Sequence, residues 1–298
     1  MAEKVLFIIN ATSGKRFRPI VEAQIIAACS KYNLDGEIEY TRQNGHATVL
    51  AREAVARGLL KVFACGGDGT VNEVAQALVH TSTLLGILPM GSGNGLARHL
   101  HIPVDTQRAL KLLPHYTSIS MDTLIVNNHR AVNVAGIGFD AHVAGLFGKN
   151  GKRGLNEYAR LVMKEFSRFK EFEAKLFMDG KPTEHNAFVV ALANSSQFGN
   201  NARIAPHASV CDGIMDVCFI RKIPLIEAVG FTAKLFMGKV DKSRFVTMVK
   251  ASQCSIEVSL PMPYHIDGEP FPPTKSFEVR MEPGSLKVMV PAKAPTSP

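Results

Sequence analysis

The sequence predicts an α/β domain of the doubly wound type, followed by a region that is rich in short antiparallel strands. In the first half of the chain, apolar strand-like runs alternate four times with helix-patterned segments, which is typical of a mostly parallel sheet. After about Asp122, β-forming segments recur at short spacing with turns between them. At 298 residues the chain is long enough for two domains, each with its own core.

Each element of the first half is predicted from an apolar run and the turn residues that bound it. The predicted strands are Lys4–Ile9, Glu37–Thr41, Val62–Cys65 and Leu84–Leu88. Helices are predicted at about Pro19–Lys31 and His46–Ala56, from Val71 onwards and from Leu96 onwards. Polar or glycine-bearing loops follow these strands. Because the carboxyl ends of parallel strands form the ligand-binding edge of such a sheet, we expect the loops to meet there.

The loop Gly66-Gly67-Asp68-Gly69-Thr70 is the strongest candidate for a binding site. Glycines between a strand and a helix leave backbone N–H groups uncovered, and such groups bind phosphate. The carboxylate of Asp68 would repel phosphate unless a divalent cation lay between them, which indicates a metal nucleotide. An ordinary strand-to-helix turn explains this motif alone at least as well. A second glycine loop, Gly91-Ser92-Gly93-Asn94-Gly95, at the same predicted edge favours the nucleotide site.

The second half is predicted to form an antiparallel sheet interrupted by two helices, at Leu155–Phe169 and Pro224–Met237. Asp179-Gly180 predicts a tight hairpin turn. The segment Gly136 to Ala141 matches a dinucleotide fingerprint but lies at the start of the antiparallel half, so we interpret it as a strand-to-helix turn. The predicted strands are Thr123–Val126, Ala131–Ala135, Ala174–Met178, Phe188–Ala193, Val217–Ile220 and Cys254–Leu260.

Composition narrows the class of partner and the compartment. The 34 basic residues exceed the 26 acidic ones, and the net charge of +8 favours anionic partners. Aromatic residues are few and are not interleaved with basic ones, which argues against nucleic acid. The five cysteines are scattered, which argues against a disulfide framework and a zinc site. With no membrane-length apolar run and no signal-peptide pattern, we expect a cytoplasmic protein.

Taken together, the motifs resemble the diacylglycerol kinase catalytic-domain family, in particular its bacterial members, which are related to sphingosine kinases. The resemblance runs from Val5 to about Val290. Ala11 stands where the family usually has proline, and Gly95 where diacylglycerol kinases often have aspartate. The motifs are Asn10-x-x-Ser13-Gly14, Thr41 with Gly45-His46-Ala47, Gly66 to Thr70, Gly91 to Asn94, Gly136-Ile137-Gly138-Phe139-Asp140, Asp212-Gly213 and Asp267-Gly268-Glu269.

The resemblance implies an ATP-binding α/β domain at residues 1–123 with about 283–298, because the last strand, Ser285–Val290, returns to it. Residues 124–282 are expected to form a lipid-binding, β-sandwich-like domain. ATP is the implied phosphate donor and Mg²⁺ the implied metal. The implied acceptor is a lipid hydroxyl.

The resemblance also implies roles for individual residues. Asp267 and Glu269 match the acidic pair that supplies the general base, and Asp68 and Asp122 match acidic residues that act on the catalytic Mg²⁺ through water. We assign the base to Asp267, because Pro270 constrains the backbone of Glu269. Asp212 matches a ligand of a structural Mg²⁺, completed by main-chain oxygens near Ser209 and Ile214. The residues matched to nucleotide contacts are Asn10, Ala11, Thr12, Ser13, Gly14, Thr41, Gly66, Gly67, Asp68, Gly69, Thr70, Asn72, Glu73, Gly91, Ser92, Gly93 and Asn94.

The leading hypothesis is an ATP- and Mg²⁺-dependent lipid kinase that acts at the inner face of a membrane as a peripheral protein. The alternatives are an NAD kinase, a catalytically silent lipid- or nucleotide-binding regulator, and a kinase for a soluble alcohol. The basic and apolar segment from Arg160 to Lys170 fits either a solvated helix face or a helix that rests on an anionic bilayer. A homodimer is left open.

Overall fold

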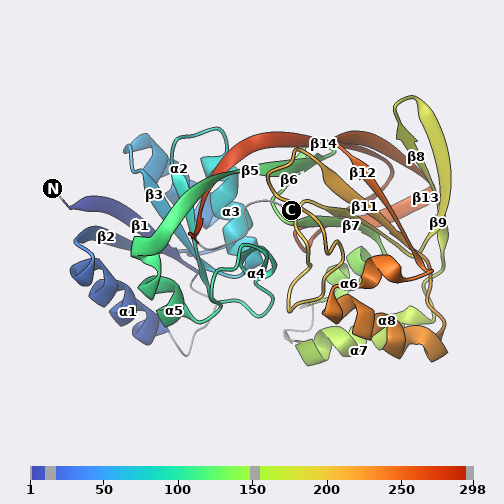
Figure 1. The fold of residues 1–298 in the computed structure, drawn as a ribbon, viewed down its shortest axis with the longest axis horizontal. Coiled ribbons are helices and arrows are strands. Elements are labelled where there is room, and N and C mark those ends of the chain that lie inside the picture. Colours follow the sequence, from blue (N-terminus) through green and yellow to red (C-terminus); the bar gives the residue numbers. More distant parts are fainter. Residues whose placement is uncertain (1, 11–17, 148–154, 293–298) are drawn as a thin grey trace. The chain divides into compact units, whose positions relative to one another are not determined.

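The structure, a computed structural model, describes residues 2–10, 18–147 and 155–292 (Figure 1). The chain divides into two compact units: unit 1 comprises Met1–Asp122 and Pro283–Ser297, and unit 2 comprises Thr123–Glu282. Strands β5 (Tyr116–Val126) and β14 (Glu269–Pro291) contribute residues to both units. The predicted fold class, α/β followed by a β-rich region, is confirmed.

Unit 1 is built on a parallel sheet in which β14, β4, β3, β1 and β2 lie side by side in that order. Near its end β14 pairs with β4, where Val288 lies opposite Leu85. The elements of unit 1 that precede β5 are β1 (Glu3–Ile9), α1 (Arg18–Lys31), β2 (Leu34–Tyr40), α2 (His46–Ala56), β3 (Lys61–Gly66), α3 (Asp68–Leu78), β4 (Leu84–Pro89), α4 (Gly95–His99), α5 (Thr106–Lys111) and the 3₁₀ turn η1 (Leu113–His115).

The apolar pattern of these segments explains why they form this sheet. The central strand β1 buries every side chain from Val5 to Ile9, as a parallel strand covered on both faces must. The rings of Phe7 and Phe63 stack across β1 and β3 with centroids 4.7 Å apart. Helix α2 buries residues three or four positions apart, which places its apolar side against the sheet; these are Ala47, Leu50, Ala51 and Ala54.

Unit 2 contains antiparallel strands in the order β12, β11, β10, β7, β13 and β14. Strand β8 pairs with β13 and β9, and β5 pairs with β14 and β6. Besides β5 and β14, its elements are β6 (His129–Ala131), β7 (Val134–Gly138), α6 (Phe139–Leu146), α7 (Leu155–Phe166), β8 (Phe172–Met178), β9 (Lys181–Ala187), β10 (Val189–Ala193), β11 (Met215–Ile220), α8 (Leu225–Met237), the 3₁₀ turn η2 (Val240–Lys242), β12 (Val246–Ala251) and β13 (Gln253–Ile266).

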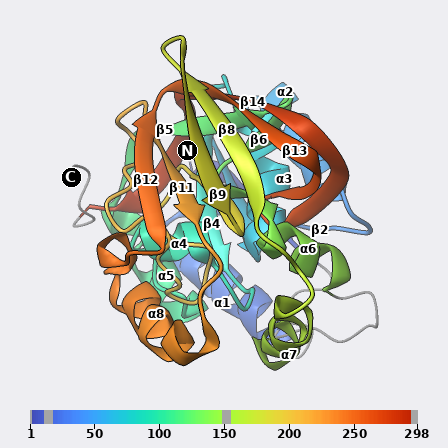
Figure 2. The ribbon, with the colours of Figure 1, turned by 90° about the vertical axis from the view of Figure 1, so that its right-hand side faces the viewer.

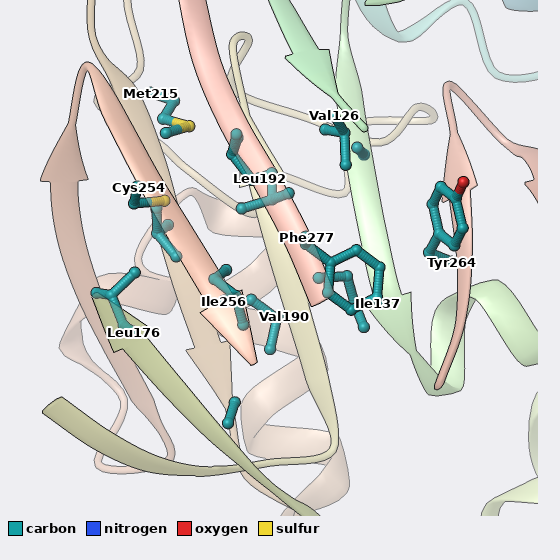
Figure 3. Close-up of a cluster of buried hydrophobic side chains, with 14 of the residues drawn as sticks. Val126, Ile137, Leu176, Val190, Leu192, Met215, Cys254, Ile256, Tyr264 and Phe277 are labelled. Atoms are coloured by element: carbon teal, nitrogen blue, oxygen red, sulfur yellow. The ribbon is translucent and has the colours of Figure 1, made fainter. Parts of the chain in front are cut away.

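Two apolar cores lie on opposite faces of the central strands of unit 2. Because strand side chains alternate, Val190 and Leu192 of β10 enter one core and Ala191 the other. Figure 3 shows the first core, where Ile256 and Phe277 from β13 and β14 pack with side chains of β7 and β10. The second core lies beneath α6, α7 and α8. The three helices therefore cover one face of this sheet.

The structure confirms the hairpin predicted at Asp179-Gly180. Both residues have left-handed backbone conformations, with φ of 51° and 73°, and they join β8 to β9. Helix α3 begins at Asp68, three residues earlier than predicted, and an acidic residue in the first turn suits the positive end of the helix dipole. The predicted strand Ala131–Ala135 is divided between β6 and β7. Helix α5 and strands β9 and β12 were not predicted, because their apolar patterns are short or weak.

In the described ranges, 2–10, 18–147 and 155–292, no helix combines the length and the apolar character that crossing a membrane requires. All five cysteines are free thiols, and only Cys211 is exposed. Burial raises the pKa of the Cys254 thiol to about 12, with a further contribution from the charge of Glu278. Since the thiolate is the reactive form, the buried cysteines are unsuited to act as nucleophiles.

Candidate active site

Apart from Asp122 on β5, the described candidate residues of unit 1 lie at or after the carboxyl ends of its parallel strands. Backbone hydrogen bonds continue from strand to strand at this edge: the N–H of Asn10 donates to Cys65 over 3.0 Å, and that of Thr41 to Ile9 over 3.0 Å. The N–H of Met90 donates to the carbonyl of Gly66 over 2.8 Å. Asn10, Thr41 and Met90, which directly follow β1, β2 and β4, thus each bond to a neighbouring strand at the edge where the loops were predicted to meet. Ala11, Thr12, Ser13 and Gly14 lie outside the described residues.

The two glycine loops are in direct backbone contact. A Cβ atom on Gly91 would lie 2.6 Å from the Cα of Gly67, closer than real Cβ contacts come. Glycine at position 91 is therefore required for the loops to approach each other. A Cβ atom on Gly69 would meet nothing within 4 Å. Packing does not explain that glycine, and its missing side chain leaves the first turn of α3 open to a ligand.

Polar side chains hold these loops in shape. Asn94 has a left-handed backbone with φ of 49°, and its side chain accepts a hydrogen bond from the N–H of Gly91 and donates one to its carbonyl. The Asn10 amide donates to the hydroxyl of the buried Thr70 over 2.8 Å, which ties the end of β1 to α3. These bonds fix the backbone of the loops, while Ser92 is exposed.

Two predicted nucleotide contacts have local structural roles. The Glu73 carboxylate accepts a hydrogen bond from the N–H of Ala47 over 3.1 Å, at the start of α2. It acts as a cap for a helix whose own N-cap residue, Gly45, has no side chain. Asn72 accepts from Gln76 one turn further along α3, over 3.1 Å. Both residues therefore stabilise the helices behind the loop.

The two acidic residues predicted to act on the catalytic Mg²⁺ lie in different surroundings. Asp68 is half-buried in the first turn of α3, beside the glycine loops. Asp122 is only 2% exposed, and its carboxylate accepts a hydrogen bond from the N–H of Gly284 over 2.7 Å. Gly284 has a φ of 58°, which favours glycine. Asp122 thus fastens β5 to the returning strand β14.

In unit 2, the carboxylate of Asp267 accepts several backbone hydrogen bonds within a turn. One carboxylate oxygen accepts from the N–H groups of Asn133 and Val134, both over 3.0 Å, and the other accepts from Val132 over 2.8 Å. Its backbone is left-handed, with φ of 49°. A carboxylate that already accepts three N–H groups is poorly placed to take a proton from a substrate. Glu269, by contrast, is exposed at the start of β14.

A buried histidine–aspartate pair supports the same turn, and sequence reasoning missed it. His265 Nε2 lies 3.1 Å from a carboxylate oxygen of Asp140, and their side chains are 6% and 11% exposed. The N–H of Gly268 donates to His265 Nδ1 over 3.2 Å, so in neutral His265 the proton is on Nε2 and is donated to Asp140. The position of His265, two residues before Asp267, was the available signal.

The Gly136-x-Gly138 motif makes room for this pair. It joins β7 to α6, which confirms the predicted strand-to-helix turn. A Cβ atom on Gly136 would lie 1.9 Å from a carboxylate oxygen of Asp140 and 2.4 Å from His265 Nε2. Any side chain at position 136 would therefore displace the pair.

We expect Gly136→Ala to lower the free energy of unfolding by about 1–3 kcal/mol, the usual cost of overpacking a tight site. The measurement is denaturant unfolding. Gly145→Ala is the matched control, because a Cβ atom there would lie 3.8 Å from its nearest neighbour, Pro270. If the two variants unfold alike, the space at Gly136 is not required.

The predicted structural metal site falls on a tight turn. The Asp212 carboxylate accepts from the N–H of Ile214 over 3.1 Å, and the Ser209 hydroxyl accepts from Cys211 over 3.3 Å. Burial raises the pKa of nearby Asp216; the charges of Lys250 and His207 lower it, and that of Asp212 raises it. A cation beside Asp212 would relieve that repulsion. In the part of the chain that the structure describes, no group of three or more His, Cys, Asp or Glu side chains could hold a metal.

A surface cavity of about 280 Å³ lies elsewhere in unit 1, at the amino ends of the strands. Glu3, Lys61, Leu84 and Lys287 are among the residues that line it. Since the glycine loops follow the carboxyl ends, this cavity is separate from the candidate site.

Two family models match consecutive parts of the chain. The family model described as the diacylglycerol kinase catalytic domain matches residues 4–126. The model described as the YegS C-terminal NAD kinase beta sandwich-like domain matches residues 133–290. The chain therefore belongs to the diacylglycerol kinase catalytic-domain family, which confirms the predicted family and the predicted enzyme class of kinase.

Individual relatives cover nearly the whole chain. A protein named probable lipid kinase YegS-like from Alcanivorax borkumensis is 30% identical over 87% of this chain and 88% of its own length. The diacylglycerol kinase of Bacillus subtilis is 28% identical over 90% of each chain. A crystal structure of a diacylglycerol kinase from Bacillus anthracis has a TM-score of 0.76 at 22% identity and covers 97% of each chain, which shows the shared fold.

Proposed function

We propose that this protein is an ATP- and Mg²⁺-dependent lipid kinase that phosphorylates a lipid hydroxyl at the surface of a membrane. The observation that carries the proposal is the contact between the Gly67 and Gly91 loops at the open first turn of α3, in a chain of this kinase family. Uncovered N–H groups at a helix start bind phosphate oxygens. Relatives named as lipid kinases support a lipid as acceptor.

Phosphoryl transfer mainly requires positioning and the neutralisation of charge. In this proposal the glycine loops and Asn10 would position the nucleotide, and Asp68 and Asp122 would hold Mg²⁺. When bound, Mg²⁺ neutralises phosphate charge. Asp212, with main-chain oxygens near Ser209 and Ile214, holds the second, structural Mg²⁺.

For the base we propose Glu269 in place of Asp267. An exposed carboxylate can accept the proton of the lipid hydroxyl, whereas the oxygens of Asp267 accept three backbone N–H groups. Asp267 is then a positioning residue that sets the turn before Glu269. His265 also supports this turn by accepting from the N–H of Gly268, and Asp140 holds His265.

The proposal is tested by incubating the purified protein with γ-labelled ATP, Mg²⁺ and separate acceptors, namely diacylglycerol, a sphingoid base, NAD and a sugar. We expect label in a lipid and its loss when EDTA removes Mg²⁺. Label in NAD would instead establish the NAD kinase alternative. The description of the second family model names an NAD kinase-like domain. A folded protein that labels none of these acceptors would support the alternative of a catalytically silent lipid- or nucleotide-binding regulator.

A further inference from the structure

Helix α8 carries an exposed apolar stripe, which we call the α8 outer face. It consists of five large residues with these exposed fractions: Leu225 78%, Ile226 91%, Val229 81%, Phe236 49% and Met237 65%. At about 100° per residue, their side chains occupy about 120° of the helix circumference. The solvent side of an ordinary surface helix is polar, so an exposed apolar stripe indicates an interaction surface.

The stripe is not needed to attach the helix. On its opposite side, Phe231 and Leu235 pack on the core beneath β7, β10 and β11. The carbonyl of Leu235 accepts from the N–H of Arg203 over 3.1 Å, and Gly238 ends the helix with a φ of 66°. Helix α8 is therefore anchored by one apolar side and presents another outward.

The segment that contains α8 and its two flanks is rich in basic residues. The segment 221–244 contains Arg221, Lys222, Lys234, Lys239, Lys242 and Arg244 against Glu227 and Asp241, a net charge of 6 − 2 = +4. Glu227 is itself paired with Arg244. An apolar stripe with a basic border matches an anionic bilayer, whose acyl chains and headgroups offer both kinds of contact.

Helix α7 carries further exposed basic and apolar residues. Figure 2 shows α7 and α8 at the same end of unit 2, and both pack on the same core. The Lys222 ammonium, just before α8, donates to the carbonyl of Phe169, just after α7, over 2.6 Å. On α7, Met163 is 79% exposed, beside the exposed Arg160 and Lys164.

We propose that the α8 outer face enters the boundary between headgroups and acyl chains of an anionic bilayer, with exposed basic residues of α7 and of the segment 221–244 on lipid headgroups. The inference rests on the proposed lipid kinase function and names the surface that function would use. A second copy of the chain is the less suitable occupant, because a two-fold contact would bring the +4 segment against itself.

The test is co-sedimentation of the full chain with vesicles of phosphatidylcholine, alone or mixed with phosphatidylglycerol. We expect binding to the anionic vesicles that weakens with salt, and a loss of about tenfold in the double variant Ile226→Ser, Val229→Ser. Ile26→Ser is the matched control, because Ile26 is 57% exposed on α1 of unit 1. Thermal unfolding checks that all variants are folded.

Equal binding by the double variant and the wild type would overturn the inference. The inference would also be overturned if the wild type forms a dimer, does not bind vesicles, and loses the dimer in the double variant. The occupant of the α8 outer face would then be a second copy of the chain. Vesicle binding needs no turnover, so the two proposals fail separately. If the double variant loses vesicle binding but phosphorylates micellar diacylglycerol normally, both proposals are supported. If vesicle binding depends on α8 but the wild type phosphorylates no lipid, only the proposed function is refuted.

Discussion

Replacing Asp68 by alanine is expected to lower kinase turnover about a thousandfold or more while the protein stays folded. A carboxylate beside phosphate-binding loops is useful there only through a metal ion, and charge neutralisation supplies most of the catalysis in phosphoryl transfer. Asp68 is also an acidic residue in the first turn of α3, so its loss should cost about 0.3–1 kcal/mol of stability. Steady-state kinetics and thermal unfolding measure the two effects.

Asp35→Ala is the control for this experiment, because Asp35 is an exposed acidic residue on β2 of the same unit. It should leave turnover unchanged. Wild-type turnover in folded Asp68→Ala would contradict the proposed metal-nucleotide site.

The second large effect is expected at Glu269. Glu269→Gln should lower kcat by about 10²–10⁴-fold with little change in nucleotide affinity, because a general base acts in the transition state. The exposed side chain should be replaceable without loss of stability. Kinetics, nucleotide binding and unfolding are measured on the same preparation, with Glu278→Gln on the same strand as the control for an exposed carboxylate.

Asp267→Asn should behave differently. The amide nitrogen of asparagine is a donor, so it would face a backbone N–H group of residues 132–134 that now donates to the carboxylate. We expect a loss of about 1–3 kcal/mol in stability, with a fall in activity that follows the distorted turn. If Asp267→Asn is inactive yet fully stable while Glu269→Gln is active, the base is Asp267, as the sequence alone suggested.

The local elements were accessible from the sequence because their signals are local. The alternation of apolar strands with helix-patterned segments predicted the parallel sheet, and α2 spans His46–Ala56 as expected. Asp179-Gly180 predicted its hairpin because the turn needs two left-handed residues in succession. The glycine loops could be assigned to one edge of the sheet, since parallel strands bring their carboxyl ends together.

The tertiary structure decided what each acidic residue does within the fold. Asp140 and His265 are 125 residues apart, Asp267 and Val132 are 135, and Asp122 and Gly284 are 162. The periodicity of apolar residues in the sequence does not predict such distant pairs, because their geometry arises only when β7, β13 and β14 are assembled. The two apolar sides of α8 illustrate the same limit. The sequence predicted a helix at Pro224–Met237, but only packing determined that Phe231 faces the core and Ile226 faces outward, since hydrophobicity alone does not state which side is covered.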